Sequence, residues 1–388
     1  MSVIAPDVRL PREIYYDSKP LATEASQETR TYLTVNGGTF RHDGSNVARV
    51  LISAGGTSLL NGQASFLQYT IKNTTTTATD GLALSQGVPW CQSVRITSGG
   101  QVLEQTDAFN RYTAALNVCQ QSPSQLRCQG SFYGGAGTRQ SGGPAYPVEA
   151  AVAGTPQLGV MEGPLYSQVA APLLQNEERT FATPLHMGIF NSSKYYPLCL
   201  DNNGLEISFT LAPPSALGAS CLASGNGGPG TGVLNTIGVS YEITDVRLVC
   251  SIVNVSSSVV DQLKAELAMS GSLTMATETC TAYQDSIAAT ESSVSLNIPC
   301  KSRSINNIMT TVCGTAAKTT VSTFSTDVFQ RQDITEWSYM LAGARSPSLP
   351  VSFRERTVAA SPNRAGDVSS TACHALKAWG TLGDAALS

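Results

Sequence analysis

The feature that most constrains the fold is a series of short alternating runs that begins at residue 31. Apolar and polar residues alternate in TYLTVNG, ARVLIS, SFLQYTIKN and SVRITSG, and turns rich in Gly, Asn and Thr separate these runs. A period of two places the apolar side chains on one face of a strand. Regularly spaced short strands are typical of a β-sandwich or a closed roll. The sequence therefore predicts an all-β fold.

One local unit, SVRITSGGQVLEQTDAFNRYTAAL, can be predicted in more detail. Gly99 and Gly100 can supply the positive φ angles that a tight hairpin turn needs, and apolar residues alternate on either side of them. Phe109, Tyr112 and Leu116 then recur at spacings of three and four residues, which is typical of an amphipathic helix. The unit predicts a hairpin followed by a short helix, and it contains no catalytic residue.

The composition favours a protein with a weakly charged surface. Charged residues make up 13% of the 388 residues, about half the usual share of soluble proteins. A surface of this kind is tolerated when other subunits cover it, although a secreted β-sandwich with a neutral surface fits as well. The net charge is −4 and Lys and Arg are not clustered, so sequence-specific or bulk binding of nucleic acid is not expected.

The pattern divides the chain into four parts. Residues 1–30 contain prolines and mixed charges and predict an extended N-terminal arm. Strand-like runs fill residues 31–214, and small flexible residues at 215–235 predict a linker. Residues 236–388 begin with a second set of strands and a short helix in SSVVDQLKAELAMSG. A Gly-, Ala- and Pro-rich stretch at 130–163 predicts a long loop that is functional or forms an interface.

Residue patterns that would support catalysis are missing from the sequence. His42, His186 and His374 lie far apart, with no carboxylate or cysteine at ligand spacing. GNGGPG at 225–230 has the glycine spacing of a dinucleotide-binding loop, but Pro229 and the neighbouring glycines predict a linker instead of a strand-to-helix turn. We therefore predict no catalytic residue, no metal ligand and no cofactor, and a protein that is not an enzyme.

The cysteines are predicted to be core residues. The chain has ten, without any Cys-x-x-Cys spacing, and its N-terminus lacks the apolar stretch of a signal peptide, which favours a reducing compartment. Several lie in apolar runs, such as Cys250, where a thiol behaves as a small core residue.

Four stretches, in this order along the chain, resemble one protein family. The first is the hairpin and helix around SGGQVLE, and the second is FATPLHMGIFNSSKYYPLCL at 181–200. The third is YEITDVRLVCSIVNVSSSVVDQL at 241–263. The fourth is ITEWSYMLAGARSPSLPV at 334–351, followed by ACHALKAWGTLGD at 372–384. Together they resemble the double jelly-roll major capsid proteins of the adenovirus and tectivirus lineage, most closely those of Polinton-like viruses, virophages and nucleocytoplasmic large DNA viruses. The positions that match the family's motifs are Gly99, Gly100, Phe109, Tyr112, Leu116, Pro184, Leu185, Gly188, Phe190, Pro197, Leu198, Trp337, Gly343, Pro347 and Pro350.

The resemblance implies a fold of two eight-stranded jelly rolls in tandem, a double jelly roll, with short flanking helices. The first roll would span 31–214 and the second 236–388. Three copies would form a pseudo-hexagonal capsomer, and capsomers would tile an icosahedral shell around double-stranded DNA. The implied partners are further copies of this chain, penton proteins and minor capsid proteins, above an internal membrane in some viruses. The implied location is the virion, after assembly inside the host cell.

The resemblance has one departure and leaves alternatives. In the family, several more strands commonly follow the helix that 372–384 resembles. The second roll is therefore either compact or incomplete, and of these two we expect it to be incomplete. A different class of protein, a viral spike or a secreted lectin-like β-sandwich that binds a ligand, has the same strand pattern but predicts paired cysteines and a signal peptide. A capsid protein of a small RNA virus is disfavoured because the chain has no basic N-terminal arm.

Overall fold

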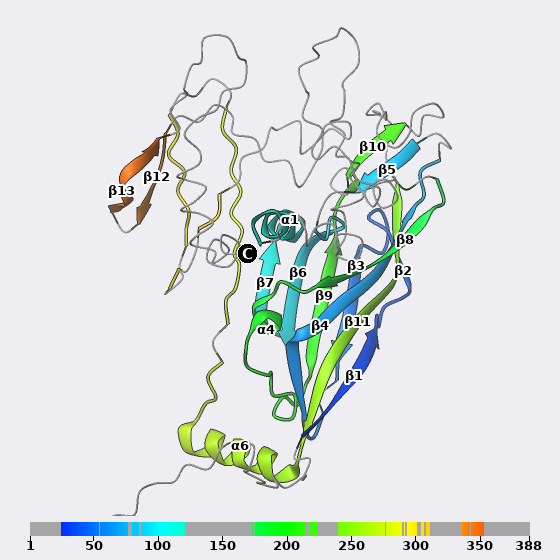
Figure 1. Cartoon of the computed structure of the whole chain (residues 1–388), viewed down its shortest axis with the longest axis vertical. Helices are drawn as coiled ribbons and strands as arrows, with labels where there is room; N and C mark the ends of the chain where they lie inside the picture. The colour runs from blue at the N-terminus through cyan, green and yellow to red at the C-terminus, as the bar shows by residue number, and fades with distance from the viewer. Residues whose placement is uncertain are drawn as a thin grey trace, which may run out of the picture.

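The computed structural model describes residues 25–53, 55–76, 80–84, 87–120, 173, 175–214, 218–222, 240–275, 277–288, 291, 293–300, 304–305, 308–310, 336–341 and 343–352. Strands make up most of its regular structure (Figure 1). In chain order the elements are β1 (Ala25–Leu33), β2 (Thr39–Phe40), β3 (Val47–Ile52), β4 (Ser58–Asn73), β5 (Asp80–Leu84), β6 (Cys91–Ser98), β7 (Gln101–Asp107), α1 (Phe109–Gln120), β8 (Glu178–Pro184), α4 (Gly188–Asn191), β9 (Leu205–Leu211), β10 (Gly218–Leu222), β11 (Tyr241–Val255), α6 (Ser257–Ser270), β12 (Glu336–Leu341) and β13 (Ala344–Ser352).

Two antiparallel sheets form the body of the molecule. The first has the order β1-β11-β4-β8, with β2 also paired to β11, and the second has the order β3-β9-β6-β7. Buried side chains from both sheets belong to one hydrophobic core, which lies between them. Two smaller sheets, β5 with β10 and β12 with β13, complete the described strands.

The alternation predicted from the sequence decides which face of each strand is buried. In β9, Leu205, Ile207, Phe209 and Leu211 are buried, while the residues between them, such as Glu206, are only partly covered. The core therefore receives every second side chain, and the other face of the sheet meets solvent, as is usual for antiparallel sheets.

The centre of the core is aromatic. Tyr69 of β4 has its ring centroid 5.2 Å from that of Trp90, at an interplanar angle of 63°, and 5.6 Å from that of Phe181 of β8. Trp90 lies 6.0 Å from Phe209 of β9, in the opposite sheet. Each such pair contributes about 0.5–1.5 kcal/mol beyond area burial, so this cluster joins the two sheets. Side chains fill the interior of the sandwich.

The strand pairing has the order of a jelly roll. In chain order, the eight main strands of the two sheets are β1, β3, β4, β6, β7, β8, β9 and β11. The first pairs with the eighth, the second with the seventh, the third with the sixth and the fourth with the fifth. This is the pattern of four consecutive strand pairs that are rolled into two facing sheets, an eight-stranded jelly roll. Residues 25–255 contain the whole set.

The extent of this roll differs from the sequence-based prediction at both ends. β1 begins at Ala25, inside the expected arm of 1–30, and β11 lies between β1 and β4 instead of opening a second roll. Part of the expected linker at 215–235 forms β10, which pairs with β5. A segment of small residues has the same composition whether it joins two domains or two strands of one domain. The pairing of β11 with β1 and β4 shows which strands this segment connects.

Other local predictions are confirmed where the structure describes them. β6, β7 and α1 reproduce the predicted hairpin and helix, with φ angles of 55° and 80° at Gly99 and Gly100. α6 is the second predicted helix, and its C-terminus is capped by Gly271 at a φ of 73°. Cys91 and Cys250 are buried, as predicted for core residues, whereas Cys300 is exposed. The predicted loop at 130–163, the segment 372–384 and His374 lie outside the described residues.

A truncation experiment tests the extent of the roll. A fragment of residues 25–255 is expected to unfold cooperatively in urea, because it contains all eight strands. A fragment of residues 31–214 lacks most of β1 and all of β11, the strand that bonds both β1 and β4, and is expected not to fold. Circular dichroism and urea titration measure both. Cooperative unfolding of the shorter fragment would contradict the assignment of β11.

Candidate assembly surfaces

The first two family-like stretches meet around the carboxylate of Asp201. Its oxygens accept hydrogen bonds from Ser98 Oγ at 2.8–2.9 Å and from Tyr196 Oη at 2.9 Å. The backbone N–H of Asn203 also donates to Asp201, at 3.0 Å, and Gly99 lies against the Asn203 side chain. Asp201 therefore fastens the loop before β9 to the end of β6.

A second carboxylate, Glu104 on β7, holds the short helix α4. Only 5% of Glu104 is exposed, and both its oxygens lie 2.9 Å from the backbone N of Gly188. Burial raises the pKa of Glu104, and hydrogen bonds from the backbone N–H groups of Gly188 and Ile189 partly offset this rise. Thr106, two residues along β7, is buried as well. Sequence reasoning did not identify this site, because nothing in the strand sequence QVLEQTD marks Glu104 and Thr106 as the inward residues.

A segment from beyond the roll lies over this site. Residues 277–280, which we call the strap, follow α6 in the chain, and the carbonyl oxygen of Cys280 accepts a hydrogen bond of 3.1 Å from Thr106 Oγ1. A Cβ atom placed on Gly188 would lie 2.6 Å from the carbonyl oxygen of Glu278, so the backbones meet closely here. The strap therefore contacts both β7 and α4.

The remaining motif positions are mostly core or turn residues. Phe109, Leu116, Leu185, Phe190 and Leu198 are buried in or beside the core. Tyr112 packs against this core with its ring centroid 6.3 Å from that of Phe109.

The other motif positions lie at strand ends and in a separate hairpin. Pro184 ends β8, opposite Phe66, and the carbonyl oxygen of Pro197 accepts a 3.0 Å hydrogen bond from the N–H of Leu200. Trp337 lies in β12, Gly343 forms the turn after it with a φ of 84°, and Pro347 and Pro350 lie in β13. The structure thus joins the first two motifs in one roll, and places the fourth in its own two-stranded sheet.

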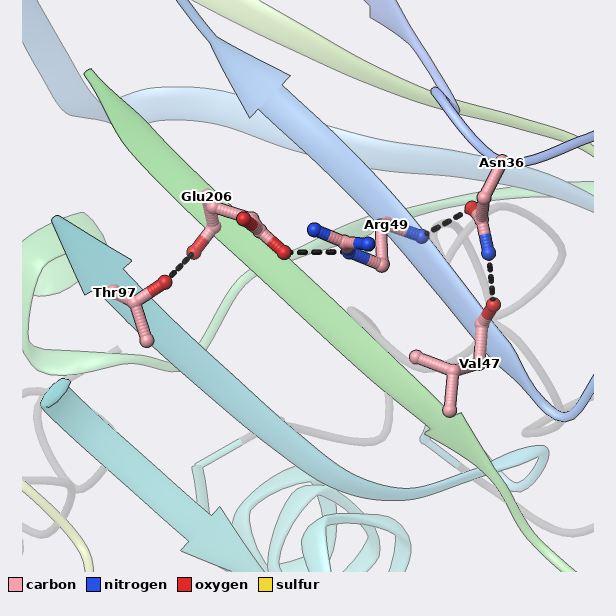
Figure 2. A network of polar contacts seen from close by, with 5 residues as sticks. All are labelled: Asn36, Val47, Arg49, Thr97 and Glu206. Carbon is pink, nitrogen blue, oxygen red and sulfur yellow. Dashed lines mark hydrogen bonds and ion pairs between the residues drawn. The ribbon is translucent and has the colours of Figure 1, made fainter. Parts of the chain in front are cut away.

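The side chain of Asn36 occupies the outer edge of β3 (Figure 2). Its Nδ2 donates to the carbonyl oxygen of Val47 at 2.6 Å, and its Oδ1 accepts from the backbone N–H of Arg49 at 2.9 Å. A single side-chain amide thus makes the two hydrogen bonds that a neighbouring strand would make. β3 is the last strand of its sheet, and the backbone of Thr34 and Val35 covers only part of its edge, with the N–H of Val35 donating to the carbonyl oxygen of Arg49 at 2.8 Å. An open strand edge invites pairing with other chains. Asn36 therefore caps part of this edge.

A polar line continues from this edge across the outer face of the sheet. The guanidinium Nε of Arg49 lies 2.6 Å from Glu206 Oε1 on β9, and Thr97 on β6 donates to the carbonyl oxygen of Glu206 at 3.5 Å (Figure 2). Hydrogen bonding to Arg49 lowers the pKa of Glu206. The Arg49 side chain is 48% exposed, so water screens the pair and it adds little to the stability of the fold.

Comparisons with known proteins find similarity only among solved structures. No protein-family model and no curated protein matches the chain. The faustovirus major capsid protein is 12% identical, with 61% of this chain and 56% of that chain covered and a TM-score of 0.36. The PBCV-1 virus capsid matches at 12% identity, 60% and 43% coverage and a TM-score of 0.34. The mavirus major capsid protein matches at 10% identity, 65% and 52% coverage and a TM-score of 0.29.

The matched solved structures include major capsid proteins. This chain spans about half the length of the proteins that it matches, between 43% and 56% of each. The assignment of a jelly roll to residues 25–255 rests on the strand order and register given above.

Two further features of the described ranges concern metal binding and membrane crossing. No group of three or more His, Cys, Asp or Glu side chains in those ranges is placed to hold a metal ion. Nor does any helix there have the length and apolar character needed to cross a membrane.

The role of Asn36 is tested by Asn36→Ala. The variant is expected to lose about 1 kcal/mol of unfolding free energy, to exchange the Arg49 amide proton faster and to associate more readily through the exposed β3 edge. Asn36→Asp is the matched control, because it keeps the acceptor for the Arg49 N–H and removes only the donor to Val47. Hydrogen exchange, urea titration and light scattering measure these effects. Unchanged exchange at Arg49 in the alanine variant would show that Asn36 does not cap the edge.

Proposed function

We propose that this chain is a major capsid protein, a structural subunit that forms the shell of a double-stranded DNA virus. The observation that supports this most directly is the complete jelly-roll pairing of eight strands within residues 25–255. Jelly rolls of this kind are the usual building units of viral capsids, and they also occur in lectins and cupins. A fold alone does not fix a function, so the features of this roll decide among these classes.

The packed interior favours a building unit over a ligand-binding barrel. Tyr69, Trp90, Phe181 and Phe209 occupy the space between the two sheets, and each is at most 1% exposed. The parts of the roll that remain free to contact other molecules are its edges, loops and outer faces. Weak overall charge, at 13% charged residues, suits surfaces that neighbouring subunits cover.

The proposal includes a second jelly roll downstream of α6. In the extended segment 293–300, Val294, Leu296 and Ile298 alternate with polar residues and are 38%, 43% and 45% exposed. Alternating apolar side chains in extended backbone are typical of a strand that buries one face in a sheet. With the β12–β13 hairpin, they are candidate strands of this second roll. The domain division would then be 25–255 for the first roll, with the second roll beginning after α6.

The proposed partners follow from the same family resemblance. Three copies of the chain would form a pseudo-hexagonal capsomer, and capsomers would contact one another, penton proteins and minor capsid proteins in the virion. The proposal includes no cofactor, no catalytic activity and no direct sequence-specific contact with nucleic acid. An internal membrane beneath the shell is compatible with it.

The oligomeric state of the full chain tests this proposal. We expect native mass spectrometry to give a homotrimer and negative-stain images to show a hexagonal outline. The trimer should persist at high salt, because a surface with few charges associates mainly through apolar and backbone contacts. A stable monomer that binds glycans on an array would contradict the proposal and favour the spike or lectin-like alternative.

A further inference from the structure

The roll buries one carboxylate where a later segment of the chain crosses it. Glu104 lies on β7 with 5% of its surface exposed, and its two oxygens accept hydrogen bonds from the backbone of α4 at Gly188. The strap, residues 277–280, contacts the same two elements. Glu104 therefore lies under the junction between the first roll and the chain that follows α6.

Contacts on both sides of Glu104 hold the strap in place. Thr106, the next inward residue of β7, donates to the carbonyl oxygen of Cys280 at 3.1 Å. On the α4 side, the missing side chain of Gly188 lets the strap approach, since a Cβ there would lie 2.6 Å from the carbonyl oxygen of Glu278 and 3.2 Å from Thr277 Cβ. The hydrogen bond and the close approach of backbones thus fix the strap on either side of Glu104.

Two titratable groups, Tyr112 and Cys280, interact electrostatically with Glu104 from the elements packed around it. Tyr112 comes from α1, and burial raises its pKa, with further rises from the charges of Cys280, Glu104 and Glu278. Cys280 and Glu278 come from the strap itself. Burial, and secondarily the charge of Glu104, raise the pKa of Cys280 to about 11. Gly188 and Ile189 of α4 contribute only backbone N–H groups. The interactions that lower the pKa of Glu104 are the hydrogen bonds from these two backbone N–H groups.

We propose that the strap is a pH-sensitive latch, which docks on the first roll more tightly in acid because docking buries Glu104. The proposal does not depend on the capsid function. A docked strap keeps Glu104 away from water and so favours its protonated form. When the strap lifts, water reaches the carboxylate and stabilises its ionised form.

The direction of the effect follows from linkage. Burial raises the pKa of Glu104 above its ordinary value of 4.5 in the docked state, so the docked state binds the proton more tightly. Docking is then strongest below the ordinary pKa, and it weakens as the pH rises through the raised pKa. A difference of one pKa unit between the docked and lifted states changes the docking equilibrium about tenfold.

Hydrogen–deuterium exchange on the full chain tests the latch. Protection factors for the amides of residues 277–280, corrected for intrinsic exchange, are compared at about pH 5 and about pH 8. We expect about tenfold higher protection in acid for the unaltered chain. Glu104→Gln keeps an oxygen that accepts the N–H groups but cannot ionise, so its protection should be high and independent of pH. Glu206→Gln removes an exposed carboxylate on β9 and should behave like the unaltered chain.

Several results would overturn the proposal. Protection at 277–280 that stays constant or rises with pH in the unaltered chain would do so, as would a pH dependence that persists in Glu104→Gln. If Glu104→Gln does not fold, the pKa of Glu104 in a second variant, Gly188→Ala, is measured instead of the protection of the strap. Gly188→Ala should lift the strap at every pH because the added methyl group meets Glu278. Carbon-13 NMR of the Glu104 carboxyl group should then give a lower pKa than in the unaltered chain, and an equal or higher pKa would contradict the latch.

Discussion

The pairing of β1 with β11 is the interaction on which the rest of the roll depends. It runs in register from Ala25 opposite Val255 to Leu33 opposite Arg247, and so joins the first and last strands of residues 25–255. On its other side β11 bonds β4, the longest strand of the sheet. Closing so long a loop costs conformational entropy, which burial of the shared core must offset. The core residues of both sheets are therefore needed together, and the roll is expected to form as one cooperative unit.

Polar side chains hold the connections that strand pairing leaves free. Backbone N–H groups in loops need acceptors when they leave solvent. Glu104 accepts them from α4, Asp201 accepts them from the loop before β9, and Asn36 pairs with the edge of β3. The three groups act at different places but by the same physical means. In each case a side chain supplies the hydrogen-bond partner that a backbone group would otherwise lack, which fixes a connection without lengthening the sheet.

With this arrangement, specific association with other molecules can involve only the outside of the roll. The interior is filled by aromatic side chains, one edge is capped, and the outer face of the second sheet carries a screened ion pair at Arg49 and Glu206. A subunit of a shell needs such control, because an open strand edge pairs with any available strand. The strap adds a contact between the roll and the chain downstream of α6, in which a buried carboxylate couples docking to protonation.

The sequence by itself determined the local elements of this protein. The alternation in LEISFTL predicts a strand with one buried face, the glycine pair at 99–100 predicts a tight turn, and the spacing of Phe109, Tyr112 and Leu116 predicts a helix. These features depend on neighbours within a few residues, so the local sequence is enough to predict them. The order of the family-like stretches also indicated the fold class. The extent of the roll was not accessible in this way, because the composition of 215–235 is the same for a linker and for a loop between strands.

Only the tertiary structure decided which distant residues meet. β11 could open a second roll or close the first, and hydrogen bonding to β1 and β4 settled this. Glu104, Asp201 and Asn36 have ordinary sequence neighbourhoods, and their roles come from partners in other elements: α4 for Glu104, β6 for Asp201 and β3 for Asn36. Such contacts depend on how the sheets fold onto each other. The physical reason is that pairing and burial are properties of segments brought together across the whole chain.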